Sequence, residues 1–435
     1  MPAVSPSRAR PRSSHGLPWH VVGVAIVALA LTAPGQTAGV SVFVDPMIES
    51  LGLSRAESSG AYMVGTLMGA LALPTVGRAL DRLGVRAVMA AVGGAFGLAV
   101  AAMAGITGLI TLAVGYAGIR LLGQGSLSLS ATTSVAVAFT RHRGLAMGLT
   151  MALGSAMLGL MPLALTGLID AVGWQRAWVV AGGVVALVIV PLALIGLRHA
   201  DRRARDDEPQ GADGQAAGPD ADDADDADPD AADGGVADGG RGDATRAEAL
   251  RSPAFWAIVG GTVATGLIGT GLQFHQISLL GEQGLTSEQA AANFVPQSVT
   301  LVLATLGTGW LADRVSHRVI VPAAMLLLIG AMLLSQVAQP GLLALLYAVG
   351  VGGSGGAARA YEAAAVPRYF GTTHVGAIRG ASMTVNVMAT ALGPVALAAG
   401  FQAAGTYAAS LLPLLALPLA VIVLALVARP AQDRG

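Results

Sequence analysis

The sequence predicts an all-α integral membrane protein of about twelve transmembrane helices, arranged as two six-helix pseudo-repeats. The first observation is composition: the 435 residues are 54% hydrophobic and 12% charged, with a mean hydropathy of +0.66. A soluble domain carries about 25% charged residues. The second observation is that apolar runs near 20 residues recur throughout, and this length crosses a ~30 Å hydrocarbon core. The third is an internal repeat.

The repeat has an offset of 232 residues. Asp81 lies in GRALDRLGVR and Asp313 lies in GWLADRVSHR, and 313 − 81 = 232. The same offset relates Gly52-Leu53-Ser54 to Gly284-Leu285-Thr286, Gly144 to Gly376, Gly148 to Gly380, Met151 to Met383, and Pro162 to Pro394. A constant offset over this length indicates two copies of one multi-helix unit. In hydrophobic chains such halves are typical of secondary transporters, with the substrate site between them.

The apolar runs define the predicted helices, because unpaired backbone groups cannot face lipid. The first run, from Trp19, follows three arginines but is too long for a signal peptide, so it is taken as a membrane span. The predicted spans are 19–43, 57–77, 87–105, 109–139, 145–168, 175–197, 253–280, 288–312, 319–337, 342–366, 377–400 and 405–428. The predicted organisation is a tail (1–18), a first half (19–197), a linker (198–252), a second half (253–428) and a second tail (429–435).

The distribution of arginine between the loops predicts how the chain is oriented in the membrane. All 25 basic residues are Arg, and with both termini inside only Arg55 and Arg176 fall in outer loops. Arg120 and Arg359 fall within spans, and the remaining arginines lie on the inner side. This distribution follows the positive-inside rule, so both termini are predicted to be cytoplasmic. Abundant Ala, Gly and Arg without Lys is typical of a GC-rich bacterial genome, so the predicted location is the bacterial cytoplasmic membrane.

The linker between the halves contains GPDADDADDADPDAADGG, which is acidic and free of large apolar residues. Such a segment cannot bury enough surface to fold, so it is predicted to be disordered. Its carboxylates suggest calcium as an alternative, but their spacing does not match an EF-hand.

Other function classes are disfavoured by what the sequence lacks. The chain has no Cys, and without any Lys no Walker-type nucleotide site can form. The seven histidines have no metal-binding spacing, and no GxSxG nucleophile motif is present. We therefore expect no enzyme, no cofactor, no metal site and no nucleic-acid partner. No obligate protein partner is evident, and the expected partners are the lipid bilayer, a small-molecule substrate and protons.

GRALDRLGVR resembles the cytoplasmic signature loop of the major facilitator superfamily, and GWLADRVSHR resembles its second copy. The matching positions are Gly77, Asp81, Arg82, Gly84 and Arg86 in the first copy, and Gly309, Leu311, Ala312, Asp313, Arg314 and Arg318 in the second. Ser316 replaces the usual glycine. The resemblance implies alternating access between two rocking halves. It also implies that these loops control the conformation through Asp–Arg ion pairs, the alternative being that they only hold the loops in shape.

Further stretches are similar to the monocarboxylate-porter and oxalate–formate-antiporter branch of that superfamily. They are TAPGQTAGVSVFVDPMIESLGLSRAE, RHRGLAMGLTMALGSAMLG, FHQISLLGEQGLTSEQAA and RYFGTTHVGAIRG. The resemblance implies uptake of a small organic anion such as a monocarboxylate, by symport with protons. The alternatives are proton-driven export of apolar drugs or metabolites and a membrane sensor that does not transport. Relatives often carry a charge in the eighth span, where this chain has Asn293 and Gln297.

Ionisable residues within spans are candidate functional residues, because a lone charge there costs at least ~2.5–3.5 kcal/mol. Arg120 lies near the middle of the fourth span, where it could bind a substrate carboxylate. The alternatives are a bond to backbone carbonyls of a neighbouring helix or to an acid such as Glu362, and a role in a proton relay or in packing. Arg359 and Glu362 share a face of the tenth span. They are candidates for substrate binding and proton coupling, or an internally neutralised pair.

His275, near the outer end of the seventh span, is a second candidate for proton coupling, because its unperturbed pKa is near 6.5. The alternative is an ordinary helix-end histidine. Gln36, Tyr62 and Asn386 are polar groups within spans and are further candidates for substrate binding. Each of them alone could equally be an interhelical hydrogen-bonding residue.

Overall fold

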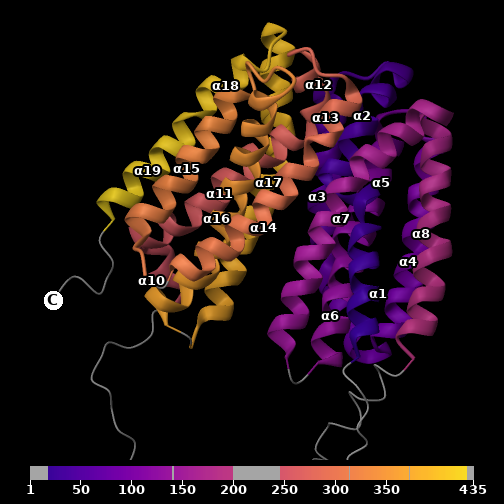
Figure 1. Cartoon of the computed structure of the whole chain (residues 1–435), viewed down its shortest axis with the longest axis horizontal. Helices are drawn as coiled ribbons and strands as arrows, with labels where there is room; N and C mark the ends of the chain where they lie inside the picture. The colour runs from indigo at the N-terminus through magenta and orange to yellow at the C-terminus, as the bar shows by residue number, and fades with distance from the viewer. Residues whose placement is uncertain (1–17, 140–141, 199–244, 313, 372, 429–435) are drawn as a thin grey trace, which may run out of the picture.

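The computed structural model has two helical halves that lie side by side (Figure 1). It describes residues 18–139, 142–198, 245–312, 314–371 and 373–428. The first half contains α1 (Trp19–Ala30), η1 (Ala33–Gly35), α2 (Thr37–Leu51), α3 (Arg55–Leu83), α4 (Val85–Ala102), η2 (Met103–Gly105), α5 (Leu109–Ile119), η3 (Arg120–Leu127), α6 (Ser128–Ala138), α7 (Arg143–Val172) and α8 (Trp174–Gly196).

The second half contains α10 (Arg246–Arg251), α11 (Pro253–Phe274), α12 (Gln276–Gly281), α13 (Ser287–Ala292), α14 (Phe294–Ala312), α15 (His317–Leu334), α16 (Leu342–Phe370), α17 (Val375–Ala404), α18 (Ala408–Leu414) and α19 (Ala416–Val427). When interrupted helices are joined, each half has six spans, at the predicted places in the chain. Among the described residues, nine helices are long and apolar enough to cross a membrane, and α1 and the helix around 318–334 are shorter apolar helices.

The two halves repeat each other in local detail. Gly52 adopts a positive φ of 63°, and Ser54 then begins α3 with a capping box to Glu57. At the same offset, Gly284 has a φ of 89°, and Thr286 begins α13 with a capping box to Gln289. A capping box satisfies two backbone N–H groups at a helix start, so this geometry, which both halves share, defines where α3 and α13 begin. The repeat read from the sequence is therefore a structural repeat.

Several predicted spans are interrupted rather than continuous. The first span breaks between α1 and α2, where Pro34 lacks an N–H group and Thr32 donates its hydroxyl to Leu29 O. The fourth span changes from α-helix to eight residues of π-helix at Arg120. The seventh span breaks at His275, between α11 and α12. Such interruptions are often found at functional sites.

Some predicted boundaries need correction. The predicted linker reached residue 252, but Thr245 begins a capped helix, α10, which contains residues 246–251. The predicted signature loop after residue 77 is mostly helix, because α3 continues to Leu83 and Gly84 alone (φ 80°) separates it from α4. Residues 1–17, 199–244, 313 and 429–435, on which the predicted tails, most of the linker and Asp313 fall, lie outside the described residues.

The halves meet at one end of the molecule and diverge towards the other (Figure 1). We call the end with α2, α12 and α13 the joined end, and the end with α6 and α10 the separated end. Helix α3 packs against α17, and α7 packs against α13 and α14. The helix starts and ends place Arg55 and Arg176 at the joined end and Arg82, Arg251 and Arg368 at the separated end. The predicted asymmetry of arginine therefore coincides with the two ends of the fold.

Candidate functional site

Arg120 lies at the centre of a polar cluster in the first half. Its side chain is 5% exposed. Nε donates to Thr66 Oγ1 (3.2 Å), a terminal nitrogen donates to Gly35 O (3.2 Å), and the guanidinium carbon lies 4.8 Å from the Tyr62 ring centroid. These bonds use two of its five N–H groups. One of these bonds is to a backbone carbonyl, as in the alternative to substrate binding, and Arg120 has no acidic partner among the described residues.

Glycines bring the helices of this cluster together. Gly35 packs against the backbone of Ile119 and Gly123, so the break in the first span touches the start of the π-helix. A methyl group on Gly65 would lie 2.7 Å from Ala117 N and 2.8 Å from Tyr116 Cβ. Because only glycine permits this approach of α3 to α5, Thr66 comes within reach of Arg120.

Two more of the predicted substrate residues lie at this cluster. Tyr62 is fully buried, and its hydroxyl lies 2.7 Å from Thr37 Oγ1. Gln36, which follows Gly35 directly, is half-buried and donates its side-chain amide to Thr32 Oγ1 (3.1 Å). The structure thus brings Arg120, Tyr62 and Gln36 together around the break in the first span.

Arg359 and Glu362 belong to the second half and do not form the neutralised pair that was one of the predicted alternatives. The ion pair among the described residues is Arg55 with Asp45 (2.6 Å). The Glu362 carboxylate instead accepts a hydrogen bond from Ser382 on α17. Arg359 is exposed. Glu362 is therefore hydrogen-bonded to Ser382 and forms no close ion pair with Arg359.

A row of residues on α3 forms part of the contact between the halves at the joined end, where α2 also packs against α11 and α12. The Arg55 guanidinium lies 5.3 Å from the ring centroid of Phe401, the Ser59 hydroxyl lies 3.4 Å from His275 Nε2, and the Tyr62 ring lies 4.6 Å from that of Phe274. Positions 55, 59 and 62 share one helix face. We call these three contacts the seam. It was not predicted, because the sequence does not show which face of α3 meets the other half.

His275 lies inside the seam, with 1% of its side chain exposed. Nε2 is 2.9 Å from Pro394 O, and since a carbonyl only accepts, the proton is on Nε2. Nδ1 is then a buried acceptor without a partner. His275, at the C-terminal end of α11, thus joins α3 of the first half to α17 of the second.

Gln297, one of the polar residues of the eighth span, belongs to a chain of buried amides in the second half. Gln276 donates to Ala290 O (2.9 Å), and Gln297 donates to the Gln276 side-chain oxygen (2.7 Å). Because Ala290 O only accepts, both amide orientations are fixed, and the Gln297 oxygen is left without a donor, as is that of Asn293. Asn386, also predicted, lies apart from the Arg120 cluster, against Gly266 on α11, and its Oδ1 is unpaired.

The signature residues lie at the separated end. Asp81 and Arg82 are exposed in the last turn of α3 and form no ion pair among the described residues. Arg86 and Arg318 donate to Leu194 O (3.1 Å) and Ala428 O (3.5 Å). Arg314 lies in the turn that follows α14, and its guanidinium is 4.2 Å from the ring centroid of Trp310, in the last turn of that helix. Gly77 and Gly309 lie within α3 and α14 and have no close neighbour.

Two repeated halves of membrane helices, with interrupted helices near the contact between them, are typical of secondary transporters. The Major Facilitator Superfamily model matches residues 24–394, so the chain belongs to that family and is a multi-pass secondary transporter. Its fold is similar to two structures of a bacterial homolog to the human lysosomal transporter Spinster, both inward-facing. The occupied form has a TM-score of 0.65 at 15% identity and the unoccupied form 0.60 at 16%, each covering 96% of both chains. No curated protein matches the chain.

Proposed function

We propose that this chain takes up a small organic anion, such as a monocarboxylate, together with protons. The observation that carries the proposal is the buried guanidinium of Arg120, which has no acidic partner among the described residues. A lone cation at this depth costs at least ~2.5–3.5 kcal/mol. Its retention is explained if a carboxylate binds its remaining N–H groups, since guanidinium and carboxylate match in a bidentate pair.

The proton would be carried in the second half. Glu362 is a membrane acid whose carboxylate is already hydrogen-bonded by Ser382, and the exposed Arg359 lies one turn away. His275 is the second titratable group, in the seam.

Asn386 and Gln36 are proposed to line the substrate path. The residues proposed to close the separated end when the seam opens are Asp81, Arg82, Arg86, Arg314 and Arg318.

The orientation follows from the arginine distribution. If the arginine-rich end faces the cytoplasm, as the positive-inside rule favours, the separated end is cytoplasmic. The structure is then the inward-facing state, and the joined end faces outward. Proton entry from the more acidic outside would load the transporter through the opposite conformation.

The test is a thermal-shift screen of the detergent-purified chain against small carboxylates, with Arg120→Ala and with Arg176→Ala as the matched control. Arg176 is an exposed arginine at the start of α8. We expect stabilisation by a carboxylate in the unsubstituted chain and the control, and none in Arg120→Ala. Proteoliposomes should then take up that carboxylate when a pH gradient is imposed. Stabilisation by apolar amines alone would refute the proposal and favour an exporter.

A further inference from the structure

We propose that Tyr62 is a positioning residue that links anion binding at Arg120 to the contact between the two halves at Phe274. This inference rests on the proposed function, because it takes Arg120 as the group that binds the anion. Tyr62 is fully buried, and its ring contacts both the guanidinium (4.8 Å from carbon to centroid) and the Phe274 ring (4.6 Å between centroids). One aromatic ring thus contacts the site and the seam.

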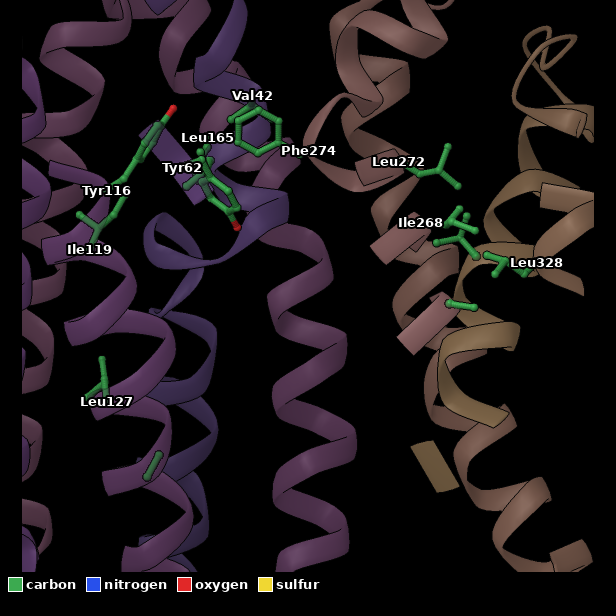
Figure 2. Close-up of a cluster of buried hydrophobic side chains, with 14 of the residues drawn as sticks. Val42, Tyr62, Tyr116, Ile119, Leu127, Leu165, Ile268, Leu272, Phe274 and Leu328 are labelled. Atoms are coloured by element: carbon green, nitrogen blue, oxygen red, sulfur yellow. The ribbon is translucent and has the colours of Figure 1, made fainter. Parts of the chain in front are cut away.

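The other contacts of Tyr62 hold the ring within the first half. Its hydroxyl is bonded to Thr37 of α2 (2.7 Å), and its ring meets that of Tyr116 of α5 edge-on, with centroids 5.5 Å apart. Figure 2 shows Tyr62 between Tyr116 on one side and Phe274 on the other. When the halves separate at the joined end, these contacts can persist, whereas the Phe274 contact must break.

Binding of an anion changes the electrostatic interaction between the Tyr62 ring and Arg120. In the structure the guanidinium attracts the face of Tyr62 through a cation–π interaction. A carboxylate on Arg120 neutralises that charge and weakens the attraction. The ring then loses one of the interactions that hold it in the position where it packs against Phe274. By linkage, whatever weakens the Phe274 contact must favour anion binding by the same factor.

One residue that bonds Arg120 and the seam residues of the first half lie on the same helix, so a movement at Arg120 can reach the seam. Thr66, which bonds Arg120, lies one turn beyond Tyr62 on the same face of α3 as Ser59 and Arg55. A shift at Arg120 is therefore passed along one helix to the three contacts of the seam. Occupation of the site loosens the joined end, which is the step that alternating access requires.

The test is a double-mutant cycle measured by calorimetric titration of acetate into the full chain in detergent. Phe274→Leu should lower the Kd for acetate by about two- to thirty-fold, the range that a cation–π interaction provides. The same substitution should leave the Kd unchanged in a Tyr62→Leu background. It should still lower the Kd in a Tyr62→Phe background, because the ring transmits the effect and the hydroxyl does not.

The outcomes separate the two proposals. An effect of Phe274→Leu that persists in Tyr62→Leu would overturn the role of Tyr62, and so would the absence of any effect in the otherwise unsubstituted chain. In both cases acetate binding that depends on Arg120 would leave the proposed function intact. If neither acetate nor any other carboxylate binds the unsubstituted chain, the proposed function fails, and the inference fails with it.

Discussion

Replacing Gly65 by Ala tests whether the close approach of α3 to α5 creates the Arg120 site. The added methyl group would lie 2.7–2.9 Å from Ala117 N and from the Cβ and C atoms of Tyr116. Optimal separations between carbon atoms are about 3.5–4.0 Å, so the helices must move apart by roughly 0.7–1 Å. Overpacking of this kind costs about 1–3 kcal/mol.

Gly60 is the matched control, because it lies on the same helix and a methyl group there would meet no atom within 4 Å. In a helix interior Ala is favoured over Gly by roughly 1 kcal/mol, and this gain is common to both substitutions. We therefore expect Gly65→Ala to be less stable than Gly60→Ala by about 1–3 kcal/mol.

The same displacement has a consequence at the site. The bond from Arg120 Nε to Thr66 Oγ1 is 3.2 Å long. If the two atoms move apart by roughly a further 0.7 Å, their distance becomes too long for a hydrogen bond. The measurements are thermal unfolding in detergent at one fixed scan rate, since unfolding of membrane proteins is often irreversible, and carboxylate binding. Equal unfolding midpoints and equal binding for the two variants would refute the reasoning.

Three further predictions follow from other contacts. Arg55→Ala removes the ion pair with Asp45 and the stacking on Phe401. Without these contacts the joined end should open more often. A cysteine introduced at the buried Val42 of this cysteine-free chain should therefore react faster with a maleimide in Arg55→Ala, whereas Arg176→Ala should not change the rate. Glu362→Gln keeps an acceptor for Ser382 but cannot carry a proton, so uptake driven by a pH gradient should be lost while substrate exchange persists. The Ser54 backbone N–H and hydroxyl both donate to the Glu57 carboxylate (2.8 Å each) in the capping box that begins α3. Ser54→Ala should therefore destabilise the start of α3 by about 0.5–2 kcal/mol, which hydrogen exchange in its first turn would measure.

The sequence predicted the membrane class, the two halves and the order of spans because apolar length and a constant offset are properties of the chain itself. It missed the breaks at Pro34–Gly35 and His275 because hydropathy continues through them. A proline or glycine inside a membrane helix is often tolerated, so neither residue marks a break by itself.

The site was predicted only in part, for a geometric reason. Arg120, Tyr62 and Gln36 were named as polar groups within apolar spans, and they meet because Gly35 and Gly65 allow close approach. Which of them bind substrate stays a prediction. The seam and the Gln276–Gln297 chain depend on helix rotation, which spacing along one helix does not reveal. Arg359 and Glu362 share a helix face, but the acid is bonded to Ser382 on another helix instead.

The two copies of the repeat have diverged in a way that divides the chemistry between them. The residue equivalent to Arg120 is Gly352, which packs directly against the backbone of Gln297 and leaves no room for a side chain. The residue equivalent to Glu362 is Ser130, which bonds only its own helix, at Ser126 O. The buried cation therefore belongs to one half and the membrane acid to the other.

This division has a mechanical consequence. If each half moves as a rigid body, the surroundings of Arg120 and of Glu362 within their own halves are nearly unchanged by the motion. Coupling between them must then pass through contacts that the motion makes and breaks. The seam is such a set of contacts, and its third member, Tyr62 with Phe274, directly adjoins the cation. If Arg120 binds an anion as proposed, the seam is therefore the place where the energy of binding would be converted into a change of conformation.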